Sequence, residues 1–130
     1  MISIDIVTPS RRLVQGGGAD SLKVPAFRGE LTILPGHTEL LTLLNTGVLS
    51  FVHEGRERKF AVSFGFLEVR DDRAIVLAET CEESTEISRE RAQAAQKKAE
   101  DAISAGLAED KFKKYQLKLQ RAILRQQVSE

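Results

Sequence analysis

The stretch AVSFGFLEVRDDRAIVLAE, from Ala61 to Glu79, decides the fold of this chain. It is apolar along most of its length and is interrupted by Gly65 and by Asp71-Asp72, which are residue types that separate strands. The pattern therefore predicts short strands joined by turns, and Gly65 indicates a bulge or a close backbone approach. Four apolar residues share one parity and are expected on one sheet face: Phe60, Val62, Phe64 and Phe66.

Strand patterns also fill the chain before this stretch. Ile2, Ile4 and Ile6 recur with the period of two that is typical of a strand with one buried face. The other predicted strands are Leu13–Gln15, Ser21–Val24, Leu31–Leu34, Val48–His53, Arg58–Ser63, Phe66–Arg70 and Arg73–Thr80. Many short strands with turn residues and no amphipathic helix between them predict an antiparallel β-sandwich or flattened barrel over residues 1–82.

After Cys81 the composition changes to strong helix formers such as Ala, Glu, Gln, Lys and Arg. We predict a first helix from an N-cap at Ser88 to about Ala105, stopped by Gly106, and a second helix from a cap at Asp110 to about Gln127. The expected apolar stripes are Ala92, Ala95, Ala99 and Ala102 on the first helix, and Phe112, Tyr115, Leu119 and Ala122, with Ile123 adjacent, on the second. The five-residue link favours an antiparallel hairpin over residues 83–130.

The predicted hairpin should be only marginally stable by itself. Its first stripe is mostly alanine, so it buries little apolar area against the entropy of ordering two helices. We therefore expect the hairpin to lean on the sandwich, on another protein, or on each in turn.

Charge does not favour nucleic acid or a membrane surface as the partner of the whole chain. The 130 residues contain 19 Lys and Arg against 19 Asp and Glu, whereas such partners normally require a basic excess on one face. This balance is an average, because residues 1–82 carry 9 basic and 11 acidic residues, and residues 83–130 carry 10 basic and 8 acidic ones. The two parts therefore suit different partners.

Neither covalent cross-links nor a membrane span is expected. Cys81 is the single cysteine, and no Cys/His cluster has the spacing of a zinc site. The longest apolar run, Ala74 to Ala78, is far shorter than the roughly 20 residues of a spanning helix, and no leader pattern precedes the first strand. We therefore expect a soluble, non-exported chain in a reducing compartment.

No complete set of catalytic or metal-binding groups is found. Gly16–Gly18 lacks the Lys-Ser/Thr of a phosphate loop and is interpreted as a turn. His53 has no second His at zincin spacing, and His37 follows Pro35-Gly36 as a turn or contact residue. Cys81 is interpreted as a small, half-buried hydrophobic residue. The sequence therefore predicts no catalytic residue and no metal site.

The second predicted helix is strongly basic, and two interpretations stay open. Its basic side chains are Lys111, Lys113, Lys114, Lys118, Arg121 and Arg125. They form either a solvated face or a surface that docks on an acidic partner, since docking would relieve their mutual repulsion.

Three segments together resemble the epsilon subunit of bacterial F-type ATP synthase. They are GELTILPGHTELLTLL (Gly29 to Leu44), AVSFGFLEVRDDRAIVLAE (Ala61 to Glu79) and IDIVTPSRRL (Ile4 to Leu13). The resemblance extends over the whole chain, including the order of sandwich and hairpin, with one departure at Phe64, where the family usually has Gly.

The resemblance implies a non-catalytic rotor subunit of the central stalk. Such a subunit would require no cofactor. Its sandwich, residues 1–82, would bind the gamma subunit and the c-subunit ring, with Glu30, Gly36 and His37 as contact residues. Its hairpin, residues 83–130, would fold on the sandwich or extend toward the catalytic alpha and beta subunits and inhibit ATP hydrolysis. The chain would be peripheral, held through the complex on the cytoplasmic side of the bacterial inner membrane, without contacting nucleic acid.

The resemblance also implies two uses of the hairpin. In the extended state, basic residues would contact an acidic segment of the beta subunit: Lys111, Lys114, Lys118 and Arg121. Some family members bind regulatory ATP, and the matching positions here are Glu82, Ile87, Ser88, Arg91, Ala92, Lys98, Arg121 and Arg125. Ser88 replaces an Asp of that motif, so the carboxylate is lost. Lys98 replaces an Arg, so one planar guanidinium group is lost.

Two rival interpretations come from other functional classes. One is a free-standing nucleotide-sensing module, built from a sandwich and a responsive hairpin, which would not co-purify with gamma. The other is a small enzyme that uses His37 with Glu30 or Glu39, although no plausible nucleophile accompanies them.

Overall fold

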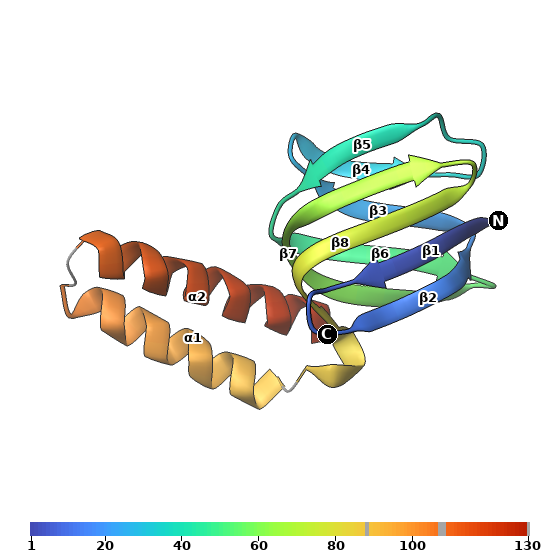
Figure 1. Cartoon of the computed structure of the whole chain (residues 1–130). Coiled ribbons are helices and arrows are strands. Elements are labelled where there is room, and N and C mark those ends of the chain that lie inside the picture. The colour runs from blue at the N-terminus through green and yellow to red at the C-terminus, as the bar shows by residue number, and fades with distance from the viewer. Residues whose placement is uncertain (88, 107–108, 130) are drawn as a thin grey trace. The chain divides into compact units, whose positions relative to one another are not determined.

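The computed structural model describes residues 1–87, 89–106 and 109–129, and the chain divides into two compact units, Met1–Glu83 and Ser84–Glu130 (Figure 1). The strands of the first unit are β1 (Ile2–Val7), β2 (Arg12–Ala19), β3 (Ser21–Ala26), β4 (Gly29–Ile33), β5 (Leu40–Leu44), β6 (Gly47–His53), β7 (Arg56–Arg70) and β8 (Arg73–Glu83). The second unit contains the short 3-10 helix η1 (Ser84–Glu86) and the helices α1 (Arg89–Ser104) and α2 (Glu109–Ser129). The division follows Glu83, one residue after the predicted boundary, because β8 continues to that residue.

The strands of the first unit form one hydrogen-bonded sheet that wraps around a common core. The strand order is β2-β1-β8-β7-β5-β3-β4, and β6 pairs with both β3 and β7. This architecture confirms the predicted sandwich or flattened barrel. The described pairs are antiparallel except β1 with β8, which is parallel.

The core of the sandwich comes from strands throughout residues 2–81. Ile2, Ile4 and Ile6 are buried, as their period of two predicts. Phe51 and Phe60 stack in the same core with ring centroids 5.8 Å apart. The unit therefore has a hydrophobic core of its own.

Two stretches for which no strand was predicted are strands in the structure. Leu40–Leu44 forms β5, although its run of leucines shows no polar alternation and was not predicted as a strand. It is a strand because all five residues pair with β7. Gly16–Gly18 was predicted as a turn but lies within β2, where Gly17 and Gly18 pair with β1. Pairing with a neighbouring strand thus overrides weak local propensity.

The prediction that four alternating residues of β7 share one sheet face was wrong for the last two of them. Phe60 and Val62 are buried, but Phe64 and Phe66 are exposed. Phe64 has a φ of 52°, so the alternation changes phase there, and Leu67 and Val69 become the buried residues. The strand also continues through Gly65, where two separate strands were predicted.

Gly65 itself fulfils the prediction of a close backbone approach. A Cβ at this position would overlap the carbonyl oxygen of Leu77 on β8. At the same point β7 changes partners, since Val62 pairs with β6 and Gly65 pairs with β5. The phase change therefore occurs where one strand passes between two neighbours.

The second unit is an antiparallel hairpin of α1 and α2 (Figure 1). Gly106 has a φ of 78° and its N–H donates to the carbonyl of Ile103, which confirms the predicted stop of the first helix. The predicted N-cap Ser88 lies outside the described residues. Asp110 lies inside α2, which begins at Glu109, so the prediction that Asp110 precedes this helix was wrong.

The buried stripe of the hairpin is narrower than predicted. Ala92, Ala99 and Ala122 are buried, but Ala95 is exposed because the stripe on α1 recurs at seven residues and Ala95 turns out of it. Phe112 and Ile123 are also exposed, whereas Leu124 and Val128, which were not predicted, are buried. Ala102, Tyr115 and Leu119 are half-buried. A hydrogen bond from the Gln126 amide to the Gln96 side chain joins the two helices.

Over the described ranges, neither helix has the length and apolarity that a membrane crossing would require.

Candidate partner-binding surfaces

An apolar row crosses four strands on the outer face of the sandwich. In register, Val7 of β1 lies opposite Leu77 of β8, Leu77 lies opposite Phe66 of β7, and Phe66 lies opposite Leu43 of β5. Residues directly opposite one another share a sheet face, so these side chains form one continuous row. Phe66 and Leu77 are each 51% exposed and Leu43 is 49% exposed. We call Val7, Leu43, Phe66 and Leu77 the apolar row.

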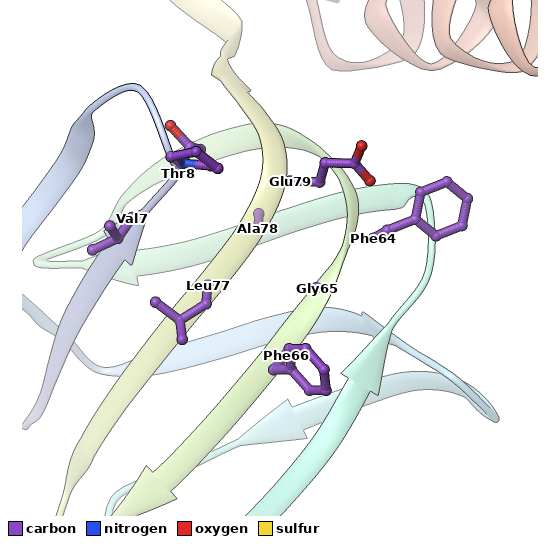
Figure 2. Close-up of a pocket in the computed structure, with 9 residues that line it drawn as sticks. Val7, Thr8, Phe64, Gly65, Phe66, Leu77, Ala78 and Glu79 are labelled. Atoms are coloured by element: carbon purple, nitrogen blue, oxygen red, sulfur yellow. The ribbon is translucent and has the colours of Figure 1, made fainter.

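Phe64 lies beside the apolar row, two residues before Phe66 on β7. Figure 2 shows Phe66 and Leu77 on neighbouring strands, with Phe64 beyond Gly65 and the carboxylate of Glu79 beside it. These residues line an open groove of about 570 Å³, whose wall is mostly apolar and also includes Pro9. Phe64 is 40% exposed although it is large and aromatic. A contiguous apolar surface of this kind marks an interaction site in a soluble protein.

Charged residues border the apolar row on the next register line. Leu41, which is 71% exposed, lies opposite Glu68, and Ile75 lies opposite both Glu68 and Asp5. The surface therefore has an apolar centre with acidic residues on one side. This arrangement is typical of a protein–protein interface with a polar rim.

A tight turn connects β4 to β5 and carries two of the predicted contact residues. The His37 N–H donates to the carbonyl of Leu34 over 3.1 Å, Pro35 occupies the second position, and Gly36 has a φ of 81°. These features are those of a type II turn, in which the third residue needs positive φ. Gly36 is exposed and His37 is half-buried, with its Nδ1 2.7 Å from the carbonyl of Thr38.

Glu30 lies at the other end of the same strand. It is the second residue of β4 and pairs with Pro25 of β3, whereas the turn follows the last residue of β4. The structure therefore does not bring Glu30 together with Gly36 and His37. Glu30 lines a different groove with Asn45 and other residues, next to the turn whose tip, Phe27, is 62% exposed.

The basic residues predicted to contact a partner differ in accessibility. Lys111, Lys114 and Lys118 are exposed on α2, and the Lys118 ammonium lies 4.9 Å from the centre of the Tyr115 ring. Arg121 is half-buried, and its Nε is buried without a hydrogen-bond partner among the described residues. The three lysines are therefore available for an electrostatic contact.

The residues that match the ATP motif are spread over both units. Glu82 is half-buried at the end of β8, opposite Ala61 in the sandwich. On the helical unit, Ala92 is buried, Arg91 and Lys98 are exposed, and Ile87, Arg121 and Arg125 are half-buried. Ser88 falls outside the described residues. Within each described helix their arrangement follows the sequence spacing, and ATP binding stays a prediction.

Titratable groups form few clusters in the part of the chain that the structure describes. Within those residues, no group of three or more His, Cys, Asp or Glu side chains is arranged to hold a metal ion. Arg58 and Glu83 form a bidentate pair with two contacts of 2.8 Å, and the hydrogen bond to Glu83 raises the pKa of Arg58 against the opposing effect of burial. His53 keeps a buried Nδ1 without a hydrogen-bond partner in the described ranges.

Sequence reasoning missed the apolar row. The signal for it is present, because both Val76 and its neighbours Ile75 and Leu77 are apolar, so β8 offers apolar residues to both faces. A strand that is apolar on both faces is normally covered on both of them. The phase change at Phe64 concealed which face of β7 joins the row.

Comparisons with known proteins agree with this architecture. The family model described as "ATP synthase, Delta/Epsilon chain, beta-sandwich domain" matches residues 1–84. The ATP synthase epsilon chain of Trichlorobacter lovleyi is 42% identical over 129 residues, covering 98% of this chain and 93% of the relative. The ATP synthase epsilon chain of Desulforamulus reducens is 39% identical over 127 residues, covering 98% of this chain and 96% of the relative.

Solved structures share the fold at low sequence identity. A chain in the Euglena gracilis mitochondrial ATP synthase, in a structure of its OSCP, F1 and c-ring, matches with a TM-score of 0.80 and 21% identity, covering 92% of this chain and 75% of that chain. A chain in the central stalk and c-ring of the Tetrahymena thermophila mitochondrial ATP synthase matches with a TM-score of 0.63 and 15% identity, covering 99% and 96% respectively. These two matches support the fold alone.

Proposed function

The chain belongs to the ATP synthase delta/epsilon chain family, and from this premise we propose that it is a non-catalytic rotor subunit of the central stalk. In this role the sandwich joins the gamma subunit to the c-subunit ring, and the helical hairpin acts on the catalytic head. The subunit is peripheral, held through the complex on the cytoplasmic side of the bacterial inner membrane. Torque transmission needs a rigid body with matched surfaces and no side-chain chemistry.

The apolar row is the observation that carries this proposal. A surface with half-exposed Leu43, Phe66 and Leu77 is costly in water and suits a long-lived protein interface. We assign it to the gamma subunit, which stays bound through every rotation. The polar turn with Gly36 and His37 is assigned to the c ring, in line with the family resemblance.

The assignment to gamma is tested by placing a charge in the row. Phe66→Glu should abolish co-purification of the chain with gamma, since a carboxylate would be desolvated inside an apolar contact. Phe112→Glu is the matched control, because Phe112 is also an exposed phenylalanine but lies on α2, outside the sandwich. Retention of gamma by a folded Phe66→Glu variant would refute the assignment.

The hairpin is proposed to inhibit ATP hydrolysis through its exposed lysines. Lys111, Lys114 and Lys118 would dock on an acidic segment of the beta subunit when the hairpin extends, an attraction that salt weakens. Replacing the three by Ala should relieve inhibition in the reconstituted complex. Lys97→Ala with Lys113→Ala is the control, since both lysines are exposed and lie outside this set. Unchanged inhibition in the triple variant would contradict the electrostatic account.

Regulatory ATP binding by the hairpin is a separate proposal, supported by Arg91, Arg121 and Arg125 at the matching positions. Because Ser88 and Lys98 depart from the motif, binding should be weak. ATP titrated into the full chain should shift hairpin NMR signals only at millimolar concentration, and the Arg91→Ala variant should shift less. An absence of shifts at that concentration would end this proposal. Co-purification with gamma separates a rotor subunit from a free-standing nucleotide sensor.

A further inference from the structure

In the turn between β4 and β5, one backbone N–H group, that of Gly36, finds its hydrogen-bond acceptor outside the turn. The closing hydrogen bond uses the His37 N–H and the Leu34 carbonyl, and Pro35 has no N–H. The Gly36 N–H takes no part in that closing bond, since the third residue of a type II turn directs it away from the turn. It donates instead to the carboxylate Oδ1 of Asp72, over 2.7 Å.

Asp72 lies 36 residues further along the chain, in the turn between β7 and β8. Arg70 pairs with Arg73, so Asp71 and Asp72 form a two-residue turn, with φ values of 50° and 57°. Positive φ at both central positions is typical of a type I′ turn, where Asp is tolerated better than most residues. The same Asp72 accepts a hydrogen bond at its backbone carbonyl from the Ser3 N–H, over 2.9 Å. It therefore connects β1, the β7–β8 turn and the β4–β5 turn.

Packing contributes little to holding the β4–β5 connection. Leu34, Pro35 and Gly36 are exposed, as are Thr38 and Glu39. On the far side of the turn, Glu39 has its carboxylate 3.8 Å from the Arg70 Nε, and both side chains are mostly exposed. A bond from a backbone N–H to a carboxylate is charge-assisted and shorter than a neutral one. The Asp72 contact is thus a charge-assisted hydrogen bond that connects this turn to the β7–β8 turn.

We propose that Asp72 is a positioning residue, which holds the Pro35-Gly36-His37 turn in the conformation that the c ring recognises. The proposal rests on the assignment of Gly36 and His37 to the ring. In it, Asp72 touches no partner itself and acts through the Gly36 N–H. The surface that meets the ring is then determined jointly by two turns that are distant in sequence.

Three variants isolate this contact. Asp72→Gly removes the acceptor and fits the positive φ, so the β7–β8 turn is kept. Asp72→Asn keeps an oxygen acceptor and also tolerates positive φ. Asp71→Gly is the matched control, because Asp71 has nearly the same φ and, among the described residues, its carboxylate accepts no hydrogen bond from the β4–β5 turn.

The experiment measures two quantities on the full chain bound to gamma. Hydrogen exchange at the Gly36 amide reports the bond, and affinity for the purified c ring reports the surface. Asp72→Gly should speed exchange and weaken ring binding, each by about fifteenfold, which is near the lower end of the range for a hydrogen bond to a charged group. Asp72→Asn should keep both the exchange rate of the Gly36 amide and the affinity for the c ring close to those of the unchanged chain. Asp71→Gly should leave both quantities unchanged.

A His37→Ala variant separates the two ways in which the proposal can fail. If His37→Ala weakens ring binding while Asp72→Gly speeds Gly36 exchange without affecting binding, the positioning role is wrong and the ring assignment stands. If neither variant alters ring binding, the ring assignment itself is wrong and the positioning role falls with it. An Asp72→Asn variant as weak as Asp72→Gly would also overturn a role based on the acceptor oxygen.

Discussion

The sandwich and the hairpin solve the problem of stability in opposite ways. The sandwich buries large side chains, including Phe60, Leu22 and Ile33, that are brought together from distant strands. Among the described residues of the hairpin, the buried ones on α1 are Ala92 and Ala99, and α2 adds Ala122, Leu124 and Val128. Since the free energy gained on folding scales with apolar area, the sandwich is rigid and the hairpin is held weakly. The proposed rotor role of the sandwich and the proposed regulatory role of the hairpin would need these different stabilities.

The sharpest test of this contrast compares one core substitution in each unit. Phe60→Ala should lower the free energy of unfolding of the sandwich by about 4 kcal/mol, because it removes a fully buried ring stacked on Phe51. Ala99→Gly should cost the hairpin only about 1 kcal/mol, mainly through helix propensity. Urea unfolding followed by circular dichroism measures both. Equal losses would contradict the division into strong and weak units.

A smaller effect is expected at the edge of the sandwich. Arg58 pairs with Glu83, the last residue of β8, and its guanidinium lies 5.3 Å and 5.4 Å from the ring centres of Phe51 and Phe60. Arg58→Ala should therefore lower the free energy of unfolding by about 1 kcal/mol, the upper range for a partly exposed pair. Arg58→Lys should retain only part of this stabilisation, since Lys lacks the planar guanidinium group that makes the two contacts with Glu83.

The pH dependence of this pair is part of the same prediction. The pKa of an Arg side chain lies far above neutrality and Glu83 raises that of Arg58 further, so its guanidinium is protonated in both the folded and the unfolded state at neutral pH. The contribution of Arg58 is complete below its unfolded pKa and is lost only as the pH rises through the folded value, far above neutrality. The cost of Arg58→Ala should therefore be constant across neutral pH. A change of that cost with pH in this range would show that another group controls the pair.

The smallest effect is expected when the weak unit is removed entirely. A chain ending at Glu83 should unfold in urea with nearly the same free energy as the sandwich of the full chain, because the core cluster lies within residues 2–81. This shortened chain should also co-purify with the gamma subunit. Loss of cooperative unfolding would show that the sandwich depends on the hairpin.

Much of the candidate site followed from local sequence. Pro35-Gly36 predicts a turn at the place where His37 is presented, and exposed lysines on α2 follow from its composition. Phe64 could not be placed, because its backbone at φ 52° inverts the alternation on which the parity argument depends. The apolar row needs strand register, which joins Leu43, Phe66 and Leu77 across three strands.

The sequence by itself determined that a block of strands precedes two helices, that the composition changes after Cys81, that a helix stops at Gly106 and which family the chain resembles, because these depend on residues close together in the chain. Only the tertiary structure decided that Leu40–Leu44 is a strand, that Phe66 faces outward, and that Asp72 binds Gly36. The physical reason is range. A hydrogen bond between residues 36 positions apart, or the register between two strands, produces no periodic pattern in the sequence from which it could be predicted.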